Sequence, residues 1–163
     1  MKSELDSKLH QLLESLSTAN LKMCDALKKE HECLTKHDNE ELLTVINEKK
    51  QLSLLIENQT RTIHKHLIEM GLKKGIYGLQ TYLETRPKSD DNQTLKLWLS
   101  IEILLKKNKT HNEGNGAIVE LNRKHTLRSL DVLRGQTGTQ ANETYGSDGY
   151  TQKEKITRNI SIV

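Results

Sequence analysis

The fold is decided by residues 5–34, which read LDSKLHQLLESLSTANLKMCDALKKEHECL. Apolar side chains recur there at alternating steps of four and three residues: Leu5, Leu9, Leu12, Leu16, Ala19, Met23, Ala26 and Cys33. That spacing places them along one side of an α-helix, as in the seam between packed helices, and Leu13, Leu27 and Leu34 widen the seam. Glu30 is the one charge within it, and we expect its carboxylate to be paired or to reach solvent near the helix end.

A second helix is predicted to begin at Asp38, because Asp38 is a good N-cap and Glu41 three residues later completes a capping box. Its seam continues at Leu42, Val45, Lys49, Leu52, Ile56, Gln59, Ile63, His66 and Met70, with Leu43, Ile46, Leu55 and Leu67 beside it. The connection of about three residues makes the two helices antiparallel neighbours. Lys49 either lies beside Glu30 or reaches solvent.

The next segments are a short helix over residues 76–84, ended by Arg86-Pro87, and a third long helix from near Asp91 to Gly135. The middle of the third helix is polar and holds two glycines: Asn108, Asn112, Gly114, Asn115 and Gly116. Each glycine costs a helix about 1 kcal/mol relative to Ala. Two alternatives follow: one long helix that is weakened there, or two helices with a break.

Composition supports helices throughout. The 163 residues include 26 Leu, one Pro and no Phe, and 29% of them are charged. An all-β sandwich is excluded by the lack of frequent turn signals, and no Gly-rich turn of a nucleotide-binding fold is present. We therefore predict an all-α fold: an elongated antiparallel helical bundle with coiled-coil-like packing, made of three long helices and a short one. Residues 1–135 form the bundle, and residues 136–163, rich in Gly, Thr, Ser and Asn, form a flexible C-terminal tail.

Charge and chemistry-bearing residues favour a binding protein over an enzyme. The net charge of +3 does not demand a nucleic-acid partner, no apolar run is long enough for a membrane span, and residues 1–6 lack a secretory signal. We expect a cytoplasmic protein without metal, cofactor or catalytic site. The groups with metal-ligand chemistry are interpreted as structural: Cys24, His31, Cys33 and His37, and the pair His64 and His66. The basic run 123–128 is interpreted as a solvated helix face.

Four motifs resemble the FlgN family of bacterial flagellar export chaperones. They are NGAIVELNR at residues 115–123, LDVLRG at 130–135, TYGSDG at 144–149 and ISI at 160–162. The resemblance implies a cytosolic, non-enzymatic helical chaperone for the two hook–filament junction proteins, also called hook-associated proteins. Such a chaperone binds the helical terminal segment of its cargo, prevents premature assembly, and delivers the cargo to the membrane gate of the type III export apparatus.

Two candidate sites follow from the resemblance and the residue pattern. The cargo-binding candidates are the apolar residues late in the third helix: Ile118, Val119, Leu121, Leu127, Leu130 and Leu133. The candidates for docking on the export gate lie in the tail: Tyr145, Gly146, Asp148 and Gly149. Leu54, Leu99 and Val119 either add partner contacts or pack within the bundle. A coiled-coil scaffold or adaptor and an RNA-binding helical protein are the alternative functions.

Overall fold

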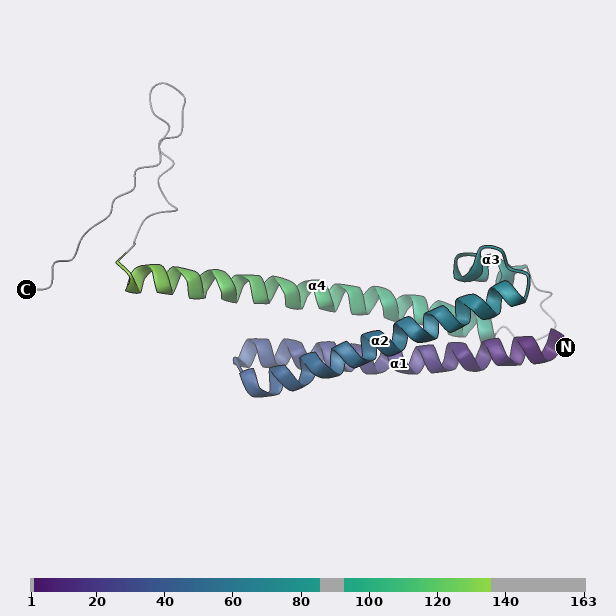
Figure 1. Cartoon of the computed structure of the whole chain (residues 1–163), viewed down its shortest axis with the longest axis horizontal. Coiled ribbons are helices and arrows are strands. Elements are labelled where there is room, and N and C mark those ends of the chain that lie inside the picture. The colour runs from purple at the N-terminus through teal and green to yellow at the C-terminus, as the bar shows by residue number, and fades with distance from the viewer. Residues whose placement is uncertain (1, 86–92, 136–163) are drawn as a thin grey trace, which may run out of the picture. The chain divides into compact units, whose positions relative to one another are not determined.

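The computed structural model describes residues 2–85 and 93–135, and the regular structure in these ranges is entirely helical. The elements are α1 (Lys2–Lys36), α2 (Asn39–Glu69), the 3₁₀ turn η1 (Gly75–Gly78), α3 (Leu79–Glu84) and α4 (Gln93–Leu133) (Figure 1). The predicted all-α fold with three long helices and a short one is confirmed. The predictions for Arg86-Pro87, Asp91 and the tail lie outside the described residues.

The backbone packs as two compact units, Met1–Ala117 and Ile118–Val163. The first holds α1, α2, η1, α3 and most of α4, and the described part of the second is the end of α4. The predicted division at residue 135 stays a prediction.

The junction of α1 and α2 depends on Asp38. Its backbone N–H donates to the Cys33 carbonyl at 3.0 Å and closes the last turn of α1, with His37 in the left-handed region at φ 57°. Its carboxylate accepts from the Glu41 N–H at 3.1 Å and caps α2. The predicted N-cap is confirmed. The reciprocal half of the predicted capping box is wrong, because the Asp38 N–H that Glu41 would accept is already donated to α1.

The seams of α1 and α2 face each other, and every predicted seam residue is buried or half-buried. The apolar core gathers where the first half of α1, the end of α2, α3 and the start of α4 meet: Leu9, Leu13, Leu16, Ile63, Leu67, Leu79, Leu83, Trp98 and Ile101. The residues expected beside the α2 seam differ in burial, and of the four only Leu67 is buried. Leu43, Ile46 and Leu55 are exposed, whereas the seam of α2 packs on α1.

α4 runs parallel to α1 within the first unit. His10 Nδ1 hydrogen-bonds Thr94 Oγ1 at 2.9 Å, and His31 Nδ1 hydrogen-bonds Asn115 Oδ1 at 3.1 Å. Both pairs are 84 residues apart in the sequence, so the register between the two helices is constant over that distance. α4 continues as one helix through Gly114 and Gly116, which decides between the two predicted alternatives.

The turn after α2 requires glycine at two positions. α2 ends at Glu69, and the chain reverses at Gly71, whose φ is 88°; the Leu72 N–H donates back to the Leu67 carbonyl at 2.9 Å. Gly75 has φ 53° and lies directly against the His64 ring, so a Cβ there would clash with the ring. These two glycines fold η1 and α3 back onto the end of α2 (Figure 1).

Candidate functional site

Beside the buried apolar residues Leu27, Leu34 and Val45, a layer of polar side chains links α1, α2 and α4; Asn20, Asn108, Asn115 and Glu30 are buried, Lys49 is half-buried, and His31 and Asn112 are exposed. We call it the polar layer, and its members are Asn20, Glu30, His31, Lys49, Asn108, Asn112 and Asn115. Asn108 Nδ2 donates to the Asn20 carbonyl at 3.0 Å, and Asn115 Nδ2 donates to the Leu27 carbonyl at 2.8 Å. The two hydrogen bonds are seven residues apart on α1 and seven residues apart on α4. Together they therefore fix the register of α4 against α1.

Glu30 and Lys49 form a largely buried ion pair at the centre of this layer. Lys49 Nζ donates to the two Glu30 carboxylate oxygens at 2.8 and 2.7 Å, and to Asn112 Oδ1 at 3.3 Å. Asn115 Nδ2 donates to Glu30 Oε2 at 2.7 Å. The paired interpretation of Glu30 is confirmed, and Lys49 lies beside it rather than in solvent. These bonds join α1, α2 and α4 at one place, and removal of either charge would leave the other buried without its partner.

The predicted cargo-binding residues lie on the last part of α4. Val119, Leu121, Leu127, Leu130 and Leu133 are exposed and Ile118 is half-buried. Earlier in the same helix, Trp98 and Ile101 are buried in the core. Leu54, Leu99 and Val119 are likewise exposed, so they do not pack within the bundle as the alternative interpretation required.

Continuous helical geometry separates residues 118–134 into two halves of the circumference. All six charged residues fall on one half: Glu120, Arg123, Lys124, Arg128, Asp131 and Arg134. The other half, which we call the uncharged face, holds Ile118, Val119, Leu121, Asn122, His125, Thr126, Ser129, Leu130, Val132 and Leu133. Leu127 lies on the charged half, apart from the other five candidates.

Val132 is a member of this face that the sequence-based candidate set omitted. It is exposed and lies eleven residues after Leu121, about three helical turns along the same line. Helical periodicity therefore could have identified it.

The charged half is partly neutralised by its own ion pairs. Arg123 binds the Glu120 carboxylate with two bonds, of 2.8 and 2.9 Å. This contact lowers the pKa of Glu120 and raises that of Arg123. The pair stays ionised near neutral pH and keeps this half of the helix hydrated.

The two cysteines are free and buried, Cys24 and Cys33 both lying on α1. Burial raises the pKa of the Cys33 thiol, and the charges of Glu41 and Asp38 raise it further. The candidates for metal ligation serve structural contacts instead: His31 binds Asn115, and His66 Nε2 donates to the Leu5 carbonyl at 2.9 Å. Within residues 2–85 and 93–135, no three His, Cys, Asp or Glu side chains gather as a metal site would need.

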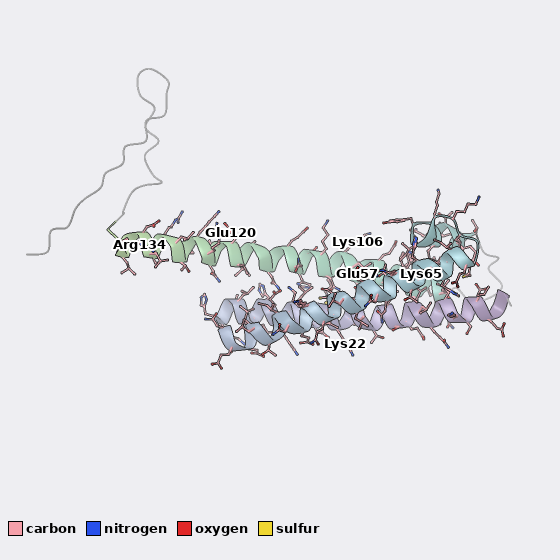
Figure 2. All side chains as sticks on the ribbon, in the orientation of Figure 1. Lys22, Glu57, Lys65, Lys106, Glu120 and Arg134 are labelled. Atoms are coloured by element: carbon pink, nitrogen blue, oxygen red, sulfur yellow. The ribbon has the colours of Figure 1, made fainter. Side chains whose placement is uncertain are left out.

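The outer surfaces of the helices carry charged side chains, among them Lys22, Glu57 and Lys65 (Figure 2). No helix in the described ranges is both long and apolar enough to span a membrane. The predicted gate-docking residues Tyr145, Gly146, Asp148 and Gly149 lie outside the described residues.

Comparison with known protein families identifies the family of this chain. The model of a family described as FlgN protein matches residues 1–153, which is nearly the whole chain. No curated protein and no solved structure matches the chain.

Proposed function

Because the chain belongs to the FlgN family, a family of flagellar export chaperones, we propose that it binds the helical terminal segments of the hook–filament junction proteins. Binding in the cytoplasm covers these segments until export, prevents their premature assembly, and delivers the cargo to the export gate. The protein acts by binding and performs no covalent chemistry.

The observation that carries the proposal is the uncharged face of α4. A helix that exposes Val119, Leu121, Leu130 and Leu133 on one half of its surface leaves apolar area in contact with water. An amphipathic cargo helix can cover this area with its own apolar residues at helical spacing. The polar groups on the same face, Asn122, Thr126 and Ser129, limit its apolar area. The affinity is therefore moderate, as release during export requires.

Substitution on the two halves of α4 tests the surface. We expect Leu130→Ala combined with Leu133→Ala to weaken cargo binding about tenfold, since each leucine loses apolar contact at the interface. Leu127→Ala is the control for each single variant, because it makes one leucine-to-alanine change on the charged half of the same helix, and we expect a smaller effect than that of Leu130→Ala or Leu133→Ala alone. Alanine favours helix, so the helical content stays unchanged.

The assay is calorimetric titration of the full-length protein with each purified junction protein. Equal losses in the control and in each single variant would show that the uncharged face is not the cargo surface. Absence of heat with both intact cargoes would overturn the chaperone proposal. A scaffold would instead oligomerise alone in size-exclusion chromatography, and an RNA-binding protein would bind RNA at low salt with a steep salt dependence.

The tail residues Tyr145, Gly146, Asp148 and Gly149 are proposed to dock on the cytoplasmic domain of the export gate. A short motif separate from α4 lets the chaperone hold cargo and reach the gate at the same time. Tyr145→Ala should weaken gate binding and leave the heat of cargo binding unchanged. A variant that loses both to the same extent would contradict this division of labour.

A further inference from the structure

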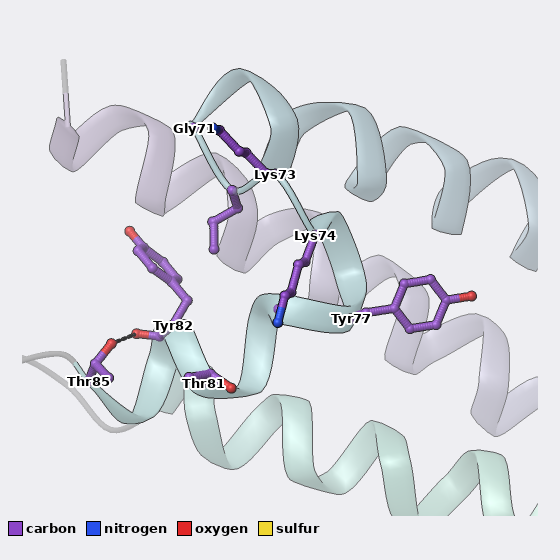
Figure 3. Close-up of a pocket in the computed structure, with 9 residues that line it drawn as sticks. Gly71, Lys73, Lys74, Tyr77, Thr81, Tyr82 and Thr85 are labelled. Atoms are coloured by element: carbon purple, nitrogen blue, oxygen red, sulfur yellow. Dashed lines mark hydrogen bonds between the residues drawn. The ribbon is translucent and has the colours of Figure 1, made fainter.

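The turn after α2 forms an open cleft that the proposed function does not use. Its volume is about 360 Å³, and its polar lining comes from Lys73, Lys74, Tyr77, Thr81, Tyr82 and Thr85 (Figure 3). A volume in this range is typical of ligand sites. Because the cleft is partly open to solvent, it suits side chains of a bound segment better than an enclosed small molecule.

The backbone around the cleft is fixed by contacts rather than free to adjust. Gly71 reverses the chain after α2, and the Gly75 N–H donates to the Leu72 carbonyl at 2.8 Å. A Cβ on Gly78 would come within 3.1 Å of Lys74 Cβ, so glycine at this position lets the lysine lie close to the floor of the cleft. The Tyr82 hydroxyl donates to Asp6 Oδ1 of α1 at 3.5 Å, and this hydrogen bond connects the α3 side of the cleft to α1. The cleft is therefore preformed.

The charged residues that line the cleft are both positive. No lining residue is acidic, and within the described residues neither Lys73 nor Lys74 makes an ion pair. The nearby Glu84 is engaged by Gln80 Nε2 at 2.9 Å. Figure 3 shows Lys74 extending toward the α3 segment that carries Thr81, whose hydroxyl adds a further hydrogen-bonding group. Two unpaired ammonium groups and neighbouring hydroxyls form a site that attracts carboxylates.

An exposed aromatic ring stands at the edge of this site. Tyr77 is 88% exposed, and its ring points away from the body of η1 (Figure 3). Tyrosine is enriched where proteins bind other proteins, because a large flat ring buries area at little cost in conformational entropy. The ring extends away from Lys73 and Lys74 (Figure 3) and has no role in the core, so a partner that contacts it must reach around the turn from the lysines.

We propose that this cleft is a second docking site, which binds an acidic peptide segment of a partner protein. Carboxylates of the segment bind Lys73 and Lys74, and an apolar side chain farther along the segment packs on Tyr77. The site lies on η1 and α3 and uses no residue of the uncharged face of α4. The protein can therefore hold this segment and a cargo helix together.

The test is an NMR titration of the full-length ¹⁵N-labelled protein with a short peptide rich in Glu and Leu, and with the same peptide carrying Gln for every Glu. We expect the Glu peptide to shift amide resonances within residues 71–85 and the Gln peptide to shift them much less. The double variant Lys73→Glu with Lys74→Glu should weaken binding about tenfold, and Tyr77→Ala about threefold. The matched control is Lys106→Glu with Lys107→Glu, an adjacent exposed pair on α4 with the same change in charge, which should bind as the unchanged protein does.

Three results would overturn the proposal. One is the absence of shifts with the Glu peptide. Another is an equal loss of binding in the control pair, which would indicate attraction to positive charge in general. The last is a lower thermal stability of the Lys73 and Lys74 variant with unchanged peptide binding, which would mean that the lysines only stabilise the carboxyl end of α2. Cargo titration of the same variant separates this proposal from the chaperone function, because cargo binding should be unaffected.

Discussion

Replacing Lys49 by Met tests the polar layer directly, because Met keeps most of the apolar stem and removes the ammonium group. Three hydrogen bonds are lost, two to Glu30 at 2.8 and 2.7 Å and one to Asn112 at 3.3 Å. Glu30 is left as a buried carboxylate, with its side chain only 10% exposed. Its one remaining described partner is Asn115, at 2.7 Å.

The expected loss of stability lies between two limits. Breaking a fully buried pair costs about 3–5 kcal/mol, whereas an exposed pair contributes about 0–1 kcal/mol. The Lys49 side chain is 19% exposed, so water reaches the site in part, and the remaining bond from Asn115 offsets some of the loss. We expect Lys49→Met to destabilise the protein by about 2 kcal/mol, or about 8 °C in Tm for a unit of this size.

The assay is urea and thermal unfolding followed by far-UV circular dichroism. Lys50→Met is the matched control, since Lys50 is the next residue, is exposed and makes no ion pair within the described residues; its effect should stay within about 0.5 kcal/mol. Adding Glu30→Gln to Lys49→Met removes the unpaired charge and should recover most of the loss. If Lys49→Met and Lys50→Met behave alike, Glu30 is solvated and the reasoning on the polar layer is wrong.

Three further predictions concern glycine, cysteine and the α4 ion pair. Gly75→Ala should destabilise the protein by about 1–3 kcal/mol, because φ of Gly75 is positive and the new Cβ would clash with His64. Gly116→Ala should stabilise it by about 0.5–1 kcal/mol, because Gly116 lies within α4 with open space around it, and thermal unfolding compares the two variants. Cys33 should react with a thiol reagent only after unfolding, because burial raises its pKa and covers it; reaction at the rate of a free thiol would contradict this. An NMR titration should give Glu120 a pKa below that of an ordinary glutamate, and Arg123→Ala should remove this shift. The ion pair's contribution to the free energy of unfolding is therefore present above the pKa of Glu120 in the unfolded chain, and it is lost as the pH falls through the pKa in the folded protein.

The helices themselves were predictable, because their signals are local. The three-and-four spacing of Leu9, Leu16 and their neighbours predicts the seam of α1, and the Asp38 carboxylate marks the start of α2 within one residue. Gly135, with φ 70°, lies two residues after Leu133, the last residue of α4, where the sequence predicted the helix to close. The exposure of Leu43 and Ile46 was not predictable from the sequence. Helical periodicity shows which residues lie on the same face of a helix, but not which other helices pack against that face.

Whether the candidate surface on α4 binds cargo stays a prediction. The apolar residues after Ile118 are visible in the sequence, and five of the six candidates fall on the uncharged face. The cleft at Lys73, Lys74 and Tyr77 was missed, because it depends on two positive φ angles and on the return of α3 to the end of α2.

The sequence by itself determined the helices, their limits and the antiparallel pairing of α1 with α2, because periodicity, capping residues and a short connection act over a few neighbouring positions. Only the tertiary structure decided that Glu30 meets Lys49 and that Asn108 and Asn115 bond the backbone of α1 at a separation of 88 residues. In an isolated α4, these asparagines together with Gly114 and Gly116 would also be compatible with a break in the helix. Burial against α1 removes that freedom, because an amide shielded from water is stable only where it finds a partner, and α1 supplies one at each heptad.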